Sequence, residues 1–301
     1  MERKLRIRFA AAAITAGAVL LNLSVQGVTA EQGPTPTLEI FNVPEFLNTQ
    51  GHGISPTGTI SGNYQSPGLG NHGFVYFDGT DYRTLDVPEP GFGTFYVRTS
   101  PTGDAVLAAG AMGAGRVTSF FERSTGEFRR IDPPPGTANL TPWGINAQGD
   151  IVGSHTPPAH AFLLKDGVFT DIHVPGTMTS AALDINAQGE IVGRYMAAGN
   201  VRRMFLRTRQ GHYHPIEAPG AMSTGLMGEP GGINDKGEIV GPFVDAQNRT
   251  KGFLLDAGGF QVIDFPNTDF VVPADIDNHG NIVGTLRITG SGRTSAFLLR
   301  R

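Results

Sequence analysis

The 301-residue sequence contains no cysteine, so neither disulfides nor thiolate metal sites can stabilise its fold. Charged residues are also scarce, at 17%, and there is a single tryptophan. Glycine (42 residues) and proline (21 residues) are abundant, while 39% of the chain is hydrophobic. A chain of this composition can bury a core, and its glycines and prolines indicate many turns rather than disorder.

Long apolar runs are missing, with one exception near the N-terminus. Four basic residues precede an apolar run from Phe9 to Leu23, and small residues follow at 28–30. This pattern predicts a signal peptide over residues 1–30, whose cleavage leaves a secreted or periplasmic chain with no membrane contact. The alternative is an uncleaved anchor helix, for which the apolar run is short.

Excess positive charge is missing as well. Residues 1–30 hold four basic residues and one acidic residue, which leaves 19 basic and 26 acidic residues in 31–301, a net charge of −7. Nucleic-acid binding favours a basic surface, so we expect no nucleic-acid partner.

The most prominent feature present is a nonapeptide that occurs six times. Its central glycines lie 40 to 48 residues apart, a period typical of solenoids and propellers. The six copies are "ISPTGTISG" (54–62), the degenerate "TSPTGDAVLAAG" (99–110), "INAQGDIVG" (145–153), "INAQGEIVG" (185–193), "INDKGEIVG" (233–241) and "IDNHGNIVG" (276–284).

Two further motifs accompany the nonapeptide. An apolar run around phenylalanine, such as "HAFLLK" (160–165), follows each copy. A segment ending in proline, such as "FTDIHVP" (169–175), follows only the first five copies, and its sixth version, "LEIFNVP" (38–44), precedes the first copy. This displacement predicts that the N-terminal strand completes the sheet begun by "SAFLLR" (295–300), which closes a ring and leaves no open sheet edge there.

Each unit reads as four short strands joined by turns. Within 140–175, Asn146 and Gly149 bound a type I turn, and Gly167 suits a second tight turn. The middle strands are apolar at consecutive positions, as expected for strands covered on both sides. We therefore predict one all-β domain over 31–301, a six-bladed β-propeller with four antiparallel strands per blade, closed by the N-terminal strand pairing with the C-terminal blade.

The motifs "INAQGEIVG" and "HAFLL", together with endings similar to "IDxPG", resemble a bacterial extracellular repeat family named for its His-Ala-Phe (HAF) motif. The resemblance spans roughly residues 36–301 and is weakest in the second unit. It implies a secreted propeller-like repeat protein. It brings no catalytic residue set and no cofactor, so the catalytic residues remain unknown.

Loop lengths vary at only two of the four connections in each unit, and in a four-stranded blade both emerge on the same face. This variation indicates that the variable-loop face binds a ligand. The alternative is neutral drift of loops that contact nothing. The expected partner is an extracellular protein or glycan, bound by a monomer.

Five residues are candidates for ligand binding. The position before each nonapeptide lies on the innermost strand and is glycine in three units, but Arg98, Asp184 and Asp275 in the others. These charges either pair across the central channel, bind a small polar ligand or ion, or are solvated channel walls. His155 and Arg194 are further polar candidates at the channel mouth.

Three metal or phosphate motifs are weak. "GLGNHG" (68–73) opens no helix, so it cannot form a phosphate-binding turn. "DIDNHG" (275–280) begins like a calcium loop, but Leu286 stands where that loop has glutamate. His212 and His214 lack a third ligand. We expect neither a metal nor a cofactor.

The leading interpretation is a non-catalytic scaffold that binds its partner on the variable-loop face. The rival is a hydrolase or lyase that uses Asp184, Asp275, His155 and Arg194. Convergence of three or more ionisable side chains from different blades at the channel mouth would favour the enzyme.

Overall fold

A computed structural model describes residues 19–22, 36–44, 47–68, 70–77, 81–111, 115–156, 159–177, 179–226 and 229–301. The predicted signal peptide lies outside the described residues, apart from the short strand β1 (Val19–Asn22). Strands dominate the described chain, together with one 3₁₀ turn, η1 (Ala198–Asn200). No helix in these segments has the length and apolarity needed to cross a membrane.

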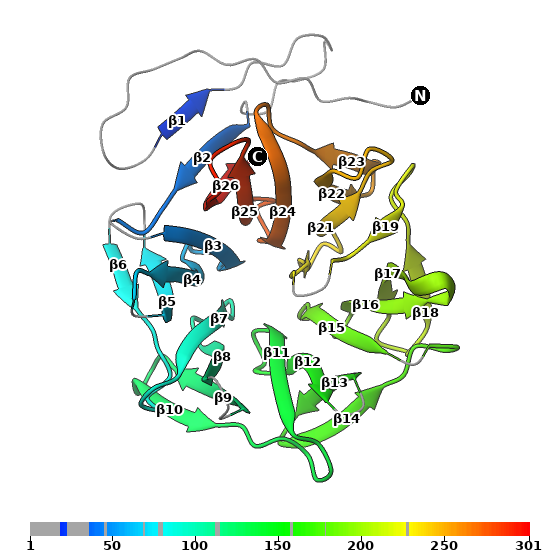
Figure 1. The fold of residues 1–301 in the computed structure, drawn as a ribbon. Coiled ribbons are helices and arrows are strands. Elements are labelled where there is room, and N and C mark those ends of the chain that lie inside the picture. Colours follow the sequence, from blue (N-terminus) through cyan, green and yellow to red (C-terminus); the bar gives the residue numbers. More distant parts are fainter. Residues whose placement is uncertain are drawn as a thin grey trace.

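Four sheets of four antiparallel strands each lie around a central axis (Figure 1). The first contains β3 (Leu47–Ile54), β4 (Ile60–Ser66), β5 (Gly70–Phe77) and β6 (Asp81–Thr84). The second contains β7 (Gly93–Thr99), β8 (Ala105–Ala111), β9 (Gly115–Glu122) and β10 (Glu127–Arg130). The third contains β11 (Asn139–Ile145), β12 (Ile151–Thr156), β13 (His160–Lys165) and β14 (Val168–Ile172). The fourth contains β15 (Ser180–Ile185), β16 (Ile191–Ala197), β17 (Val201–Arg207) and β18 (Tyr213–Ile216).

The remaining strands form one ten-stranded sheet. One part contains β19 (Ser223–Thr224), β20 (Gly232–Ile233), β21 (Ile239–Val244), β22 (Thr250–Asp256) and β23 (Gly259–Ile263). The other contains β24 (Thr268–Ile276), β25 (Ile282–Ile288), β26 (Thr294–Arg300), β2 (Thr37–Phe41) and β1. A single parallel residue pair, Thr250 with Phe270, joins the two parts.

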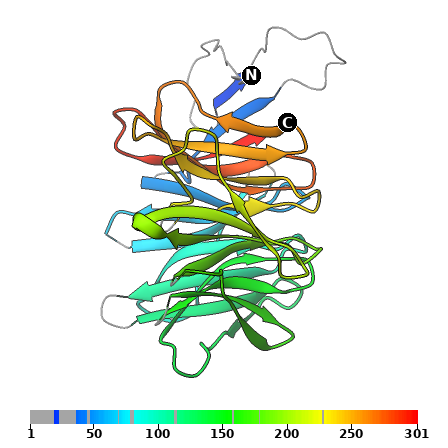
Figure 2. The ribbon, with the colours of Figure 1, turned by 90° about the vertical axis from the view of Figure 1, so that its right-hand side faces the viewer.

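The predicted all-β propeller arrangement is confirmed, whereas six separate four-stranded sheets are not found. Four sheets are separate, and the last two repeats share the ten-stranded sheet because β22 and β24 meet at one residue pair. The strands run roughly along the axis, so their connections emerge at two opposite faces (Figure 2).

The predicted pairing of the two ends of the propeller is confirmed. Strand β2 pairs antiparallel with β26 in the register Leu38 with Leu299 and Ile40 with Phe297. Leu38 and Phe41 are buried in the cores on either side of this pair. The N-terminal strand therefore covers the edge that β26 would otherwise expose.

In every copy but the second, the glycine that ends the nonapeptide lies opposite the phenylalanine of the following motif, which explains why the two motifs occur together. Gly153 lies opposite Phe162, and Gly284 opposite Phe297, in adjacent strands. A Cβ at Gly153 would lie 2.7 Å from the Phe162 ring and 2.2 Å from the Thr141 carbonyl oxygen. Only glycine leaves room for the fully buried ring, so the two motifs form one packing unit.

Candidate functional site

The repeated turn motif ties neighbouring sheets together. Asn186 Oδ1 accepts hydrogen bonds from the backbone N–H groups of Gln188 (3.1 Å) and Glu190 (2.9 Å). Its Nδ2 donates to Glu190 Oε2 (3.0 Å) and to the Asn234 carbonyl in the next sheet (3.2 Å). Asn146 and Asn234 make the same bonds to the carbonyls of Asn186 and Asp277. The donor and acceptor groups of this buried amide are already hydrogen-bonded within the protein, so we assign the motif a structural role.

Three charged residues meet at the axis, each from the innermost strand of a different sheet: Arg98 on β7, Asp184 on β15 and Asp275 on β24. They alternate around the ring with Gly53, Gly144 and Gly232. A Cβ at Gly144 would lie 2.6 Å from the Asp184 Cα, and one at Gly232 would lie 2.7 Å from the Asp275 Cα. Glycine at alternate positions therefore lets the charged strands approach the axis.

Arg98 is matched by both aspartates. Its Nη2 lies 2.7 Å from Asp184 Oδ2 and 2.7 Å from Asp275 Oδ1, and its Nη1 donates to the His52 carbonyl (3.1 Å). The backbone N–H of Ile233 donates to Asp184, and that of Ile54 donates to Asp275. All three charged side chains are buried. Of the alternatives given for these three positions, the structure shows the first: the charges pair across the channel.

The electrostatics of this axial cluster are unbalanced, because one cation faces two acids. The pKa of Asp275 is raised to about 7, because burial and the neighbouring Asp184 together outweigh the attraction of Arg98. Burial also raises the pKa of Asp184. Burial opposes the charge of Arg98, but the two carboxylates outweigh it and raise its pKa. Asp275 therefore keeps a proton until close to neutral pH.

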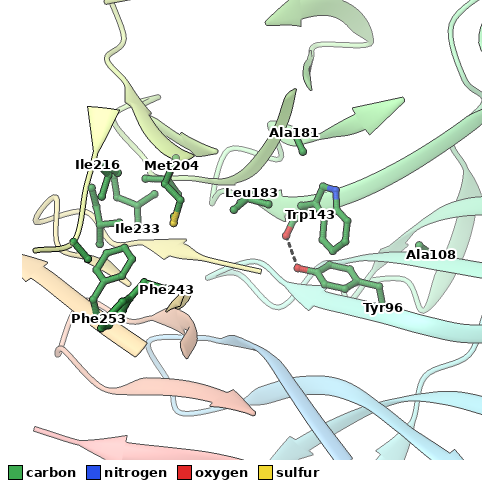
Figure 3. Packing of buried hydrophobic residues seen from close by; sticks show 13 residues of the cluster. Tyr96, Ala108, Trp143, Ala181, Leu183, Met204, Ile216, Ile233, Phe243 and Phe253 are labelled. Atoms are coloured by element: carbon green, nitrogen blue, oxygen red, sulfur yellow. Dashed lines mark hydrogen bonds between the residues drawn. The ribbon is translucent and has the colours of Figure 1, made fainter. Parts of the chain in front are cut away.

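A layer of rings separates the axial cluster from the variable-loop face. His52 stacks on Tyr96 with centroids 4.5 Å apart, and burial together with Arg98 lowers the pKa of His52 to about 3. The Tyr96 hydroxyl donates to the Trp143 carbonyl (2.7 Å), and the two rings pack edge to face (Figure 3). The Arg194 guanidinium lies over the Trp143 ring, 5.2 Å from its centroid.

A pocket of about 120 Å³ opens on the variable-loop face beside Arg194. We call it the loop-face pocket; it is lined by residues 154 and 159 of the third sheet and by 179–181, 194–196 and 202 of the fourth. Arg194 Nη1 donates to the Glu229 carbonyl (2.8 Å). Burial lowers the pKa of Arg194 to about 10, Glu229 opposes this shift, and Arg202 adds to it.

His155 belongs to neither the axial cluster nor the lining of the loop-face pocket. It lies on β12, where it is buried, and its Nε2 is 2.8 Å from Asp171 Oδ1 within the same sheet. Its Nδ1 is buried without a hydrogen-bond partner. Of the five predicted residues, the structure thus joins Arg98, Asp184 and Asp275, and it places Arg194 and His155 elsewhere.

In the calcium-like segment 275–280, the carboxylate of Asp277 binds the backbone of its own turn. Asp277 Oδ1 accepts hydrogen bonds from the N–H groups of His279 (2.8 Å) and Asn281 (2.9 Å). In the described parts of the chain, no group of three or more His, Asp or Glu residues is arranged to hold a metal ion.

Comparison with known proteins shows the fold but no family. No family model and no curated protein matches the chain. A streptogramin B lyase structure has a TM-score of 0.52 at 15% identity, covering 88% of this chain and 98% of the lyase. TolB from Acinetobacter baumannii has a TM-score of 0.56 at 11% identity, covering 84% of this chain and 65% of TolB. A Mycobacterium tuberculosis puromycin-hydrolysing peptidase has a TM-score of 0.52 at 12% identity, covering 96% of this chain and 52% of the peptidase.

The chain has a β-propeller fold. Sequence identities this low show a shared fold and nothing about function, because β-propellers include binding proteins, lyases and peptidases alike.

Sequence reasoning missed Arg202, Trp143 and Tyr96. The pairing of Met196 with Arg202 places Arg202 opposite the end of β16, two residues beyond Arg194. Aligning the sequences of β16 and β17 as an antiparallel pair would have predicted that Arg202 lies near Arg194. The ring layer had no such signal, because Tyr96 and Trp143 come from different sheets.

Proposed function

We propose that this chain is an exported, non-catalytic scaffold that binds an extracellular or periplasmic protein or glycan through the variable-loop face. The basic N-terminal segment and the apolar run behind it support export and cleavage after residue 30. In this proposal the protein binds its partner as a monomer.

The proposal includes six blades. The single Thr250–Phe270 link leaves β20–β23 and β24–β26 with β2 as two four-stranded modules. Together with the four separate sheets, they match the six copies of the nonapeptide.

One observation carries the binding function: the ionisable groups that converge on the axis are buried and occupied by one another. Arg98, Asp184 and Asp275 come from three sheets, which is the convergence expected of an enzyme. However, Arg98 is only 2% exposed, and each carboxylate also accepts a backbone N–H. The cavity that these three side chains line is only about 50 Å³, which leaves little room for a substrate beside the paired groups. The variable-loop face instead presents a pocket of about 120 Å³ lined by Arg194 and Arg202.

The alternative function is that of a hydrolase or lyase. The raised pKa of Asp275 favours it, because perturbed carboxyl groups cluster at catalytic sites.

The absence of cysteine allows a direct test of the binding face. A single cysteine is introduced at Met222 on the variable-loop face or at Val168 beside the β13–β14 turn on the opposite face; these side chains are 58% and 63% exposed. Each variant is coupled to maleimide–polyethylene glycol and applied to a glycan array and a panel of envelope proteins. We expect modification at position 222 to abolish binding and modification at 168 to leave it intact.

Equal binding by both modified variants would contradict a role for the variable-loop face. A generic hydrolase and lyase screen runs in parallel. Turnover that is lost in Asp275→Asn would establish the alternative and overturn the non-catalytic function.

A further inference from the structure

We propose that the loop-face pocket binds a sugar carrying a carboxylate, a hexuronate, through Arg194 and Arg202. This inference rests on the proposed binding function and specifies its ligand class.

The first observation is that two guanidinium groups line one pocket. Arg194 and Arg202 both line the pocket, and neither forms an ion pair with any residue in the described parts of the chain. Arg98, by contrast, faces two aspartates at 2.7 Å. The Nε of Arg202 is buried and has no hydrogen-bond partner. Buried polar groups in folded proteins are normally satisfied, so this nitrogen indicates a missing acceptor.

The second observation is that the two arginines repel one another. Arg202 is among the groups that lower the pKa of Arg194, after burial. Glu229 attracts Arg194, but only its backbone oxygen bonds the guanidinium, and burial raises the pKa of its own carboxyl. An anion between the two guanidinium groups would relieve both the repulsion and the unsatisfied Nε.

The rest of the lining favours an acidic sugar over a simple anion. The planar guanidinium fork matches the two oxygens of a carboxylate. Ser154 Oγ accepts from Trp143 Nε1 and keeps its own hydrogen to donate, and within the described chain Thr179 and Tyr195 hold hydroxyls with no hydrogen bond. Apolar surface from Ala159 and Met196 suits the C–H face of a sugar ring. A pocket of about 120 Å³ fits one ring rather than an extended peptide.

The test titrates the full chain with glucuronate and galacturonate, followed by calorimetry and by intrinsic fluorescence. Trp143 is the only tryptophan and lies beneath Arg194, so the fluorescence signal arises beside the pocket. Glucose serves as the neutral control. Inorganic phosphate and a short polyglutamate peptide test the other anions. We expect saturable binding of a uronate, at least tenfold tighter than that of glucose, phosphate or the peptide.

The variants Arg202→Gln and Arg194→Gln should each weaken uronate binding at least tenfold, and Arg202→Lys should restore part of it. The matched control is Arg293→Gln, an exposed arginine on the β25–β26 connection of the same face. Arg202→Gln should leave the melting temperature unchanged or higher, because it removes an unpaired buried donor. A purely structural arginine would instead lower the melting temperature when replaced.

Unchanged uronate affinity in both glutamine variants overturns the inference, as does tighter binding of phosphate or of the peptide. If no uronate binds while the variable-loop face still captures another partner, the ligand class fails and the scaffold function stands. If modification at Met222→Cys also has no effect on any partner, the proposed function fails with it.

Discussion

At the scale of single residues, the axial cluster shows how burial sets charge. Arg98 is one cation between two acids, so the cluster cannot be neutral unless it holds a proton. His52 lies next to it and stays neutral, because Arg98 and burial both oppose its protonation. These groups give opposite pH dependences to the stability of the fold.

The pKa of Asp275 is about 7 in the fold against an ordinary 3.8, so the folded state holds a proton that the unfolded chain lacks. Its contribution to stability is therefore present at low pH and is lost as the pH rises through this window. His52 has a pKa of about 3 against an ordinary 6.5, so its contribution is present above 6.5 and is lost as the pH falls. Between about pH 4 and 6.5 the two slopes oppose each other.

Two variants separate these slopes. With His52→Phe, which keeps the stacking on Tyr96, we expect the melting temperature to fall as the pH rises from 4 to 7. With Asp275→Asn, we expect the melting temperature to rise over pH 4 to 6.5, because the opposing contribution of Asp275 is removed and that of His52 is kept. Each slope is at most about 1.4 kcal/mol per pH unit. Thermal melts across this range measure both, and parallel profiles in the two variants would refute the assignment.

At the scale of elements, the turn motif links neighbouring sheets through one asparagine amide in each of the third, fourth and fifth units. The first two units carry Ser55 and Ser100 at this position, and their hydroxyls bond Thr57 and Thr102 within their own turns. The asparagines of the later units reach the next turn, because an amide offers a donor and an acceptor on a longer side chain. This difference explains why the motif is most regular in the later repeats.

We expect Asn186→Ala to reduce the free energy of unfolding by about 2 to 4 kcal/mol, since it leaves buried N–H groups and a carbonyl without partners. The control is Gln188→Ala, because this exposed side chain lies in the same turn. Urea denaturation compares the two. A loss at Asn186 no larger than that at Gln188 would show that the amide contributes nothing between sheets.

At the scale of the whole molecule, closure depends on strand β2. Its pairing with β26 joins residues more than 250 positions apart, and Leu38 is 1% exposed beneath it. A ring of sheets with one edge open would expose the backbone and the apolar face of β26 to water.

A chain lacking residues 31–46 should therefore melt at least 10 °C lower than the full chain or fail to fold, because one strand of closure is worth several kcal/mol. A chain lacking only 31–34 is the control. The milder change Leu38→Ala should cost about 2 to 4 kcal/mol through a buried cavity. Calorimetric melting compares all three, and an unchanged melting temperature in the longer deletion would disprove closure by β2.

The repeat spacing, the alternation of strands and turns, and the pairing of β2 with β26 followed from the sequence alone. Each depends on local patterns: strand periodicity, turn residues and the displaced sixth segment at 38–44. The charges at 98, 184 and 275 could be placed on innermost strands for the same reason, but whether they paired or faced water could not be decided.

Only the tertiary structure decided which side chains meet. Arg98 reaches Asp184 and Asp275 because the ring brings three sheets to one axis, and alternate glycines let their backbones approach. Arg194 lies on Trp143 and shares a pocket with Arg202, although Trp143 stands in another repeat. Distances between repeats depend on how the sheets pack, which local periodicity does not encode.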